Sequence, residues 1–174
     1  MPGVKILLSQ ITFDKTSAAG FRFAIVVSRW NDALTSSLKA GAQRALIDSG
    51  AAEDSIETFV VPGAFELPLA AQKAAETGRF DAVVALGVVI RGDTPHFDFV
   101  AGRASDGIMQ ASLSTGVPVM FGVVTTNTLE QAEKRCGPGD ANKGYESALS
   151  AIEVAALFRE MRNLGEEKVS PHVA

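Results

Sequence analysis

Short apolar runs alternate along the chain with longer segments in which apolar residues recur every three or four positions. The short runs cover residues 21–28, 55–61, 82–90 and 118–125, and each predicts a strand. The longer segments cover residues 32–49, 64–77, 97–114, 129–135 and 142–163, and each predicts a helix. This order of strands and helices is typical of an α/β fold with a parallel sheet between two layers of helices.

In two segments the pattern also indicates where the strand or helix lies in the fold. Residues 82–90 are apolar throughout, so we expect a central strand that is covered on both faces. The helix over residues 142–163 carries apolar side chains around most of its circumference. Such a helix is either deeply buried or shared with a neighbouring subunit, and we favour the shared helix.

The composition does not change between residues 21 and 164, which indicates one domain. We therefore expect a single-domain, three-layer αβα sandwich with a four-stranded parallel sheet, of the flavodoxin-like kind. Residues 1–20 and 165–174 flank this domain and are predicted to form an N-terminal arm and a C-terminal tail.

Composition and charge narrow the class of protein. The chain has 174 residues, of which 47% are hydrophobic, and a net charge of −4, unlike a disordered protein or one with a cationic face for nucleic acid or membrane. Its one cysteine, Cys136, cannot form an internal disulfide and has no histidine nearby in sequence to activate it. The N-terminal residues lack the apolar core of a secretory signal. We expect a soluble, cytoplasmic protein.

Several common site motifs are missing from the sequence. The first predicted strand is not followed by a G-x-G-x-x-G turn, and neither a phosphate-binding P-loop nor a G-x-S-x-G nucleophile turn occurs. Two histidines and one cysteine do not make a metal-binding pattern. These absences favour a site that uses neither metal nor nucleotide cofactor.

Candidate chemistry follows the predicted strands, where α/β proteins bind ligands. Trp30 follows the first strand, Glu66 the second, and Asp93, Thr94 and His96 the third. The start of the next helix offers free N–H groups to an anion, and a histidine can move protons near neutral pH. Each residue also has an ordinary structural explanation: Trp30 as a cap on the core, and Asp93 or Thr94 as a helix cap.

The combination of segments is more specific than any single residue. The segments VVPGAFELPLAA (60–71), GVVIRGDTPHFDFV (87–100), PVMFGVVTTNTLEQAEKR (118–135) and NKGYESA (142–148) resemble, in order, successive blocks of the lumazine synthases. The resemblance implies a transferase of riboflavin biosynthesis. Such an enzyme condenses 5-amino-6-ribitylaminopyrimidinedione with 3,4-dihydroxy-2-butanone 4-phosphate, without metal or cofactor, and makes 6,7-dimethyl-8-ribityllumazine with release of phosphate and water.

The resemblance also implies a role for each site residue. The pyrimidine half of the site would comprise Trp30 against the ring, Ala64, Phe65 and Glu66 along the ribityl chain, and Val88, Val89 and Ile90 at the ring edge. The phosphate half would comprise Asp93 and Thr94 in a loop, the catalytic residues His96 for proton transfer and Arg135 for phosphate, and Phe121 and Lys143 from the adjacent subunit. The implied assembly is a homo-oligomer, a pentamer that in this family can build a 60-mer shell.

Two residues depart from what a phosphate loop requires, and two other functions remain open. Asp93 would repel phosphate unless its side chain points outward, and Pro95 restricts the backbone before His96. An archaeal-type riboflavin synthase would share the fold, but Thr94 and Arg135 argue against it. A flavin-binding or shell-forming protein without activity is disfavoured by the presence of His96, Arg135 and Lys143.

Overall fold

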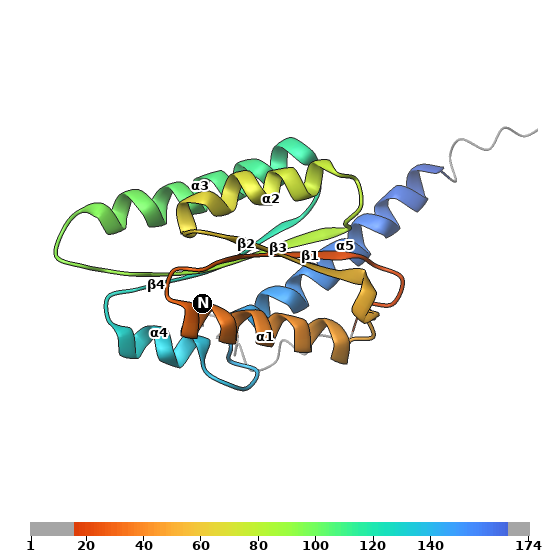
Figure 1. Ribbon diagram of the computed structural model, residues 1–174. Coiled ribbons are helices and arrows are strands. Elements are labelled where there is room, and N and C mark those ends of the chain that lie inside the picture. The colour runs from red at the N-terminus through yellow and green to blue at the C-terminus, as the bar shows by residue number, and fades with distance from the viewer. Residues whose placement is uncertain (1–15, 167–174) are drawn as a thin grey trace, which may run out of the picture.

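A computed structural model describes residues 16–166 and shows a parallel sheet between two helical layers (Figure 1). The sheet has the order β2-β1-β3-β4, and its strands are β1 (Phe23–Ser28), β2 (Ile56–Val61), β3 (Ala82–Ile90) and β4 (Val119–Thr126). The helices are α1 (Asp32–Asp48), α2 (Leu67–Glu76), α3 (His96–Thr115), α4 (Leu129–Cys136) and α5 (Lys143–Glu166), with short 3₁₀ turns η2 (Glu53–Ser55) and η3 (Ala64–Glu66). Helices α2 and α3 cover one face of the sheet, and α1, α4 and α5 cover the other. The predicted α/β fold class is confirmed.

The predicted bounds agree with the observed ones to within a few residues. The third strand matches at both ends, and the first begins two residues later than predicted, at Phe23. The helix predicted from residue 64 begins with a separate 3₁₀ turn, and the α-helix itself starts at Leu67 with Pro68 in its first turn. Proline is tolerated there because it lacks only an N–H that would be unpaired anyway.

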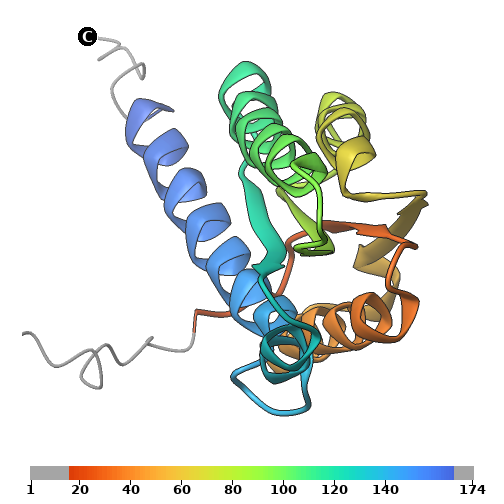
Figure 2. The same ribbon diagram turned by 90° about the vertical axis from the view of Figure 1, so that its left-hand side faces the viewer.

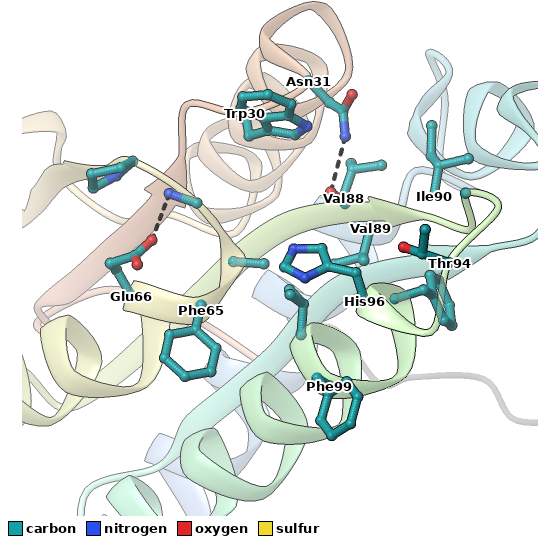
Figure 3. Close-up of a pocket in the computed structure, with 16 residues that line it drawn as sticks. Trp30, Asn31, Phe65, Glu66, Val88, Val89, Ile90, Thr94, His96 and Phe99 are labelled. Carbon is teal, nitrogen blue, oxygen red and sulfur yellow. Dashed lines mark hydrogen bonds between the residues drawn. The ribbon is translucent and has the colours of Figure 1, made fainter.

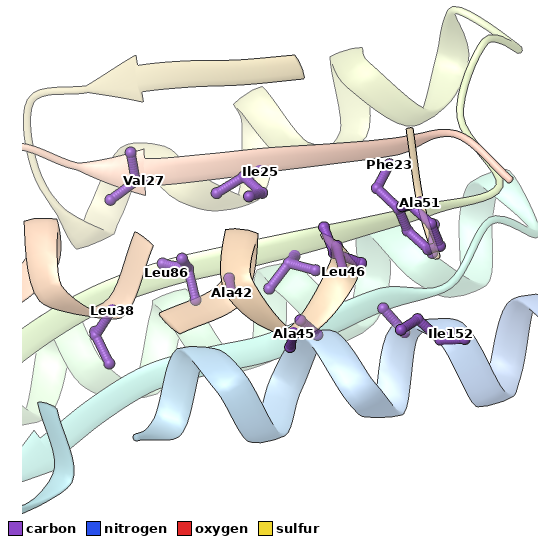
Figure 4. Close-up of a cluster of buried hydrophobic side chains, with 14 of the residues drawn as sticks. Phe23, Ile25, Val27, Leu38, Ala42, Ala45, Leu46, Ala51, Leu86 and Ile152 are labelled. Atoms are coloured by element: carbon purple, nitrogen blue, oxygen red, sulfur yellow. The ribbon is translucent and has the colours of Figure 1, made fainter. Parts of the chain in front are cut away.

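Two apolar clusters, one on each face of the sheet, form the core. Alternate residues of β1 point to opposite faces. Phe23, Ile25 and Val27 pack toward α1 and α5 (Figure 4), whereas Ala24 and Val26 pack toward α2 and α3. Strand β3 is buried on both faces over nearly its whole length, which confirms its predicted central position.

Helix α5 changes character along its length. Its first turns pack on the core through small and medium-sized apolar side chains, namely Ala148, Ala151, Ile152 and Ala155. Its later turns run past the end of the sheet (Figures 1 and 2), where Leu157, Met161 and Leu164 are exposed. A fully buried helix is therefore excluded for this end of α5, and an apolar stripe stays uncovered in a single chain.

The helical layer of α2 and α3 contains one point of very close contact. A Cβ atom added at Gly107 of α3 would lie 2.7 Å from Cβ of Pro68 in α2. Real Cβ atoms do not approach so closely, so residue 107 has room only for hydrogen. This contact fixes how near the two helices lie.

The ends of the chain are described only in part. Residues 1–15 of the predicted arm and 167–174 of the predicted tail lie outside the described residues. Ala18, within the predicted arm, is fully buried, and its N–H donates to Ser49 O at 2.8 Å. Between residues 16 and 166, no helix combines the length and apolar character needed to cross a membrane.

Candidate active site

A cavity of about 730 Å³ opens at the carboxyl ends of β1, β2 and β3, beside the start of α3 (Figure 3). We call it the apolar cavity because most of its lining is apolar. Nine of the predicted site residues line it: Trp30, Ala64, Phe65, Glu66, Val88, Val89, Ile90, Thr94 and His96. The structure therefore brings together residues from four separate segments of the sequence. This is the position at which open α/β sheets bind ligands.

Trp30 stands at the rim of the apolar cavity with 73% of its surface exposed. Its backbone is fixed, because Trp30 N donates to Pro62 O at 3.1 Å and Arg29 N donates to Val61 O at 2.8 Å. A side chain so exposed does not cap the core. The alternative that Trp30 caps the core is therefore excluded. Its indole face is exposed to a flat ligand.

Asn31 lines the same cavity and was missed by the sequence analysis. It is the one non-glycine residue with positive φ among residues 16–166, at φ 62° and ψ 47°. Its Nδ2 donates to Val88 O at 3.0 Å, as the dashed line in Figure 3 shows. Asparagine tolerates this left-handed backbone better than most residues, and an asparagine just after a strand was the available signal.

The end of β3 presents a free backbone edge to the cavity. The ladder between β1 and β3 stops at the pair Val27 and Leu86, whereas β3 continues beside β4 to Ile90. Over its last residues the β1-facing side of β3 therefore has no strand partner in the described structure. Asn31 occupies Val88 O, and the next backbone groups on that side, those of Ile90, have no strand partner in the part of the chain that the structure describes.

The turn after β2 orients Glu66. Its Oε2 accepts a hydrogen bond from Gly63 N at 2.9 Å, which closes the 3₁₀ turn and aims the carboxylate at the cavity wall. Phe65 beside it is 58% exposed, whereas Ala64 is buried. Oε1 of Glu66 has no hydrogen-bond partner among residues 16–166 and can accept a further hydrogen bond.

The loop from β3 to α3 brings the second group of predicted residues to the cavity. His96 is the first residue of α3, and Thr94 and Gly92 also line the cavity. Within residues 16–166 the exposed His96 imidazole has no hydrogen-bond partner. The exposed Asp93 side chain is absent from the lining. A proton-transfer group and a helix N-terminus thus lie side by side.

Arg91 fastens both ends of this loop and was also missed. Its Nη2 and Nη1 donate to the Asp98 carboxylate at 2.7 and 3.2 Å, and its Nε donates to Asn127 Oδ1 at 3.2 Å. Its guanidinium also lies 4.2 Å from the centre of the Phe97 ring. The hydrogen bonds from Arg91 lower the pKa of Asp98 below its ordinary value. Arg91 thereby connects the end of β3 to α3 and to the loop after β4.

The predicted cations lie in a different place. Arg135 and Lys143 line a second cavity of about 450 Å³ with Gln131, Thr125 and Thr126, beside the edge strand β4. We call it the cationic cavity. Phe121, also on β4, is 39% exposed and lines neither cavity. One chain therefore does not bring Arg135 and Lys143 to His96.

The two cations differ in how they are held. Lys143 Nζ lies 3.2 Å from Glu146 Oε2 in the first turn of α5. The Arg135 guanidinium has neither a hydrogen bond nor an ion pair to any residue between 16 and 166. An unpaired arginine with a lysine in the same cavity is well suited to a phosphate group.

Cys136 has no place in this chemistry. Its side chain is 1% exposed, and burial raises the pKa of its thiol to about 11. The thiolate required of a nucleophile is therefore scarce near neutral pH. In the described part of the chain, no three histidine, cysteine, aspartate or glutamate side chains are close enough together to hold a metal ion.

Comparison with known proteins gives a consistent result. Residues 20–159 match the family model described as 6,7-dimethyl-8-ribityllumazine synthase. A protein of that name from Desulfatibacillum aliphaticivorans is 51% identical over 146 residues, which cover 84% of this chain and 94% of the relative. Another from Chlorobium luteolum is 52% identical over 145 residues, covering 83% and 94%. The match includes both cavities.

Proposed function

The chain belongs to the 6,7-dimethyl-8-ribityllumazine synthase family, and on that premise we propose how its residues carry out the reaction. It is a transferase of riboflavin biosynthesis that acts on small molecules. The amine of 5-amino-6-ribitylaminopyrimidinedione adds to the ketone of 3,4-dihydroxy-2-butanone 4-phosphate, and loss of water leaves an imine. A proton is then removed, phosphate departs, and ring closure releases a second water.

The apolar cavity holds the pyrimidine. The ring stacks on the exposed indole of Trp30, a contact that contributes about 1–3 kcal/mol. Its polar edge meets the open backbone groups at the end of β3, next to Val88 and Ile90. The ribityl hydroxyls lie along residues 64–66, where the free Oε1 of Glu66 accepts one of them. The strand edge and the indole face thus fix the position and orientation of the pyrimidine ring before the second substrate binds.

His96 transfers the protons and the cations hold the phosphate. The imidazole lies in the first turn of α3, free of partners in the described chain, where it reaches the carbon and oxygen atoms of the bound ketone. Thr94 and the N-terminus of α3 donate to the phosphate. Arg135 adds two parallel charge-assisted hydrogen bonds, which stabilise charge as phosphate leaves. Asp93 contributes only its backbone, since its side chain does not line the cavity.

The complete site forms between two subunits. Arg135, Lys143 and Phe121 lie at or near the edge strand β4, away from His96 of the same chain. We propose that they complete the apolar cavity of the next copy in a head-to-tail ring, most simply a pentamer, which can assemble further into a 60-mer shell. The uncovered apolar turns of α5 and the exposed Phe121 give such an assembly surface to bury.

One observation carries the proposal: a single cavity combines an exposed tryptophan face, an unpaired strand edge and a histidine at a helix start. The test is to mix the purified protein with both substrates and follow lumazine fluorescence together with released phosphate. Both signals should rise in a fixed one-to-one ratio and survive EDTA and dialysis. Turnover that requires an added divalent ion or nicotinamide would contradict the mechanism.

Mixed oligomers test the composite site. The His96→Ala and Arg135→Ala variants should each be strongly impaired when expressed alone. If each site takes its histidine from one subunit and its arginine from the next, random mixing restores both residues in about a quarter of the sites. Co-refolded variants should then recover about that fraction of the wild-type rate, whereas sites contained within one chain would recover none.

We further propose that the enzyme works in the cytoplasm. A single cysteine with a buried, protonated thiol fits a reducing compartment. Cell fractionation should recover the protein with the cytoplasmic fraction, and recovery from a secreted fraction would contradict this location.

A further inference from the structure

Asn142, directly before α5, is one of the few buried polar side chains, with 3% of its surface exposed. It follows the loop that separates the two cations of the cationic cavity. We propose that Asn142 is a positioning residue that fixes Arg135 and Lys143 relative to each other and thereby sets the affinity for the phosphorylated ketone. The inference rests on the proposed function, since it presumes that the cationic cavity binds phosphate.

The amide nitrogen of Asn142 ties together the start of this loop and α1. Nδ2 donates to Cys136 O and Gly137 O, both at 2.9 Å, and to Ser37 O at 3.2 Å. Ser37 Oγ also donates to Cys136 O. These carbonyls belong to the last residue of α4, to Gly137 directly after it and to Ser37 of α1, so one side chain holds the end of α4 against the neighbouring helix. Arg135 immediately precedes Cys136.

The amide oxygen of Asn142 holds the other side. Oδ1 accepts from Gly144 N at 2.9 Å and from Tyr145 N at 3.2 Å. These are N–H groups in the first turn of α5 that no carbonyl within the helix can pair, so Asn142 caps the helix. Lys143 is the first residue of α5 and therefore takes its place from this cap.

Nothing else in the loop connects the two cations so directly. Residues 136–142 read CGPGDAN, and glycine gives little backbone stiffness of its own. The ion pair between Arg44 and Asp140, at 3.1 Å, lies on the surface, with 84% of the Asp140 side chain exposed, so it contributes little. The buried amide is the link that bridges the loop at its base.

Close packing around Asn142 leaves it one position. A Cβ atom added at Gly41 of α1 would lie 2.3 Å from Asn142 Oδ1, and one added at Gly144 would lie 2.0 Å from Leu38 O. The start of α5 thus rests directly on the backbone of α1. Because the amide is seated this tightly, a displacement of Asn142 moves the start of α5 and the end of α4 together.

The test separates the two functions of the amide. Asn142→Ser keeps a side-chain oxygen that caps α5 but loses the nitrogen that holds α4. Serine is preferred to aspartate, whose charge would act on phosphate directly. Ser37→Ala is a milder variant that removes only the second hydrogen bond to Cys136 O. Ile152→Val, in the buried part of the same helix, is the control for lost stability alone.

Asn142→Ser should raise the KM for the phosphorylated ketone and the inhibition constant of inorganic phosphate by roughly ten- to a hundredfold. The KM for the pyrimidine should stay near the wild-type value, because the apolar cavity is untouched. Ser37→Ala should shift the same two constants in the same direction by less. Ile152→Val should lower the thermal midpoint and leave all three constants unchanged.

Two results would overturn the inference. In the first, phosphate inhibition of Asn142→Ser stays at the wild-type value while Arg135→Ala weakens it; the cavity then binds phosphate and Asn142 does not position it. In the second, Asn142→Ser lowers the apparent kcat and the thermal midpoint but leaves both KM values unchanged, as a general loss of folded protein would. If Arg135→Ala itself leaves phosphate inhibition unchanged, the proposed role of the cationic cavity fails as well, and that failure is visible without Asn142.

Discussion

The two cavities are built in opposite ways. The apolar cavity lies where three strands end, and its surfaces are an indole face, a strand edge and the starts of two helices. Its key positions are fixed by backbone hydrogen bonds such as Trp30 N to Pro62 O and by the Asn31 amide. The cationic cavity lies beside an edge strand and offers the ends of long side chains, of which Arg135 is unpaired in the described chain.

On the proposed function, this difference in construction matches the ligand of each cavity. A flat heterocycle needs a rigid surface and a few well-aimed polar groups, which a sheet supplies at little entropic cost. A phosphate needs charge, and charge acts over a longer range but is screened by salt. We therefore expect pyrimidine binding to depend on shape and ketone-phosphate binding to depend on ionic strength.

The largest effect is expected from His96, which lines the apolar cavity and, in the proposed mechanism, acts on the substrate that the cations bind. His96→Ala should lower kcat by roughly 10²–10⁴-fold with little change in either KM, because proton transfer is lost and binding is retained. Steady-state kinetics measure it. Asp93→Asn, in the same loop but outside the lining, is the control and should stay near wild type. A His96→Ala variant with the wild-type rate would place the chemistry elsewhere.

Arg135→Ala should act on the other cavity alone. Loss of its charge-assisted hydrogen bonds, worth about 1.5–3 kcal/mol, should raise the KM for the phosphorylated ketone roughly ten- to a hundredfold. The kcat should also fall, because the same bonds stabilise the departing phosphate. The dissociation constant of the pyrimidine, from equilibrium titration, should not change. Lys134→Ala is a matched control, since Lys134 directly precedes Arg135 on α4 and pairs with Glu130 at 2.8 Å outside the cavity. Equal effects at both positions would point to general surface charge instead.

Trp30→Ala tests the apolar cavity in the same way. The loss of stacking should weaken binding of the pyrimidine or of lumazine by about 1–3 kcal/mol, whereas Trp30→Phe should recover most of it. Because Trp30 is the only tryptophan and 73% exposed, ligand should quench its emission in wild type, and the alanine variant should keep its thermal midpoint. Saturating ligand that leaves the emission unchanged would remove the ring from this position.

The smallest expected effect concerns the Arg91–Asp98 pair at the cavity mouth. The pKa of Asp98 is lowered in the folded chain, so the pair stabilises the fold above the ordinary pKa of an aspartate. That contribution is lost as the pH falls through the lowered pKa. Asp98→Asn should therefore lower the thermal midpoint slightly at pH 7, and the difference from wild type should vanish in acid. The effect should be small because both side chains are largely exposed. If the thermal midpoints of variant and wild type differ equally at every pH, the ion pair is not the cause and the loss comes from packing.

The sequence was enough to predict the elements and most of the apolar cavity. Apolar periodicity separates strands from helices here because β3 is covered on both faces and the helices are long. Knowing that ligands bind where strands end then selects Trp30, Glu66 and His96. Boundaries moved by up to three residues where a turn has its own hydrogen bonds, as in the 3₁₀ turn that carries Glu66.

The rest depends on contacts between distant residues. Asn31 acts through Val88, which is 57 residues away, and Asn142 through Ser37, which is 105 residues away. No local pattern predicts such pairs. The division of the site into two cavities depends on α4 and α5 packing on the face opposite α3, a consequence of strand order and crossover direction. The resemblance implied that Phe121 and Lys143 come from an adjacent subunit, but it did not show that the same chain keeps them away from the apolar cavity.

The close contact between Gly107 and Pro68 lies outside the apolar cavity but affects the position of a helix that forms one of its walls. Helix α3 is a single stiff rod from His96 to Thr115, and Gly107 lies eleven residues beyond His96, about 16 Å along the axis. We expect any side chain at residue 107 to push α3 away from α2 at this contact. Because the helix is stiff, its N-terminal end, which carries His96, should shift as well. The position of His96 in the apolar cavity thus depends on the absence of a side chain at Gly107, a residue that does not line the cavity.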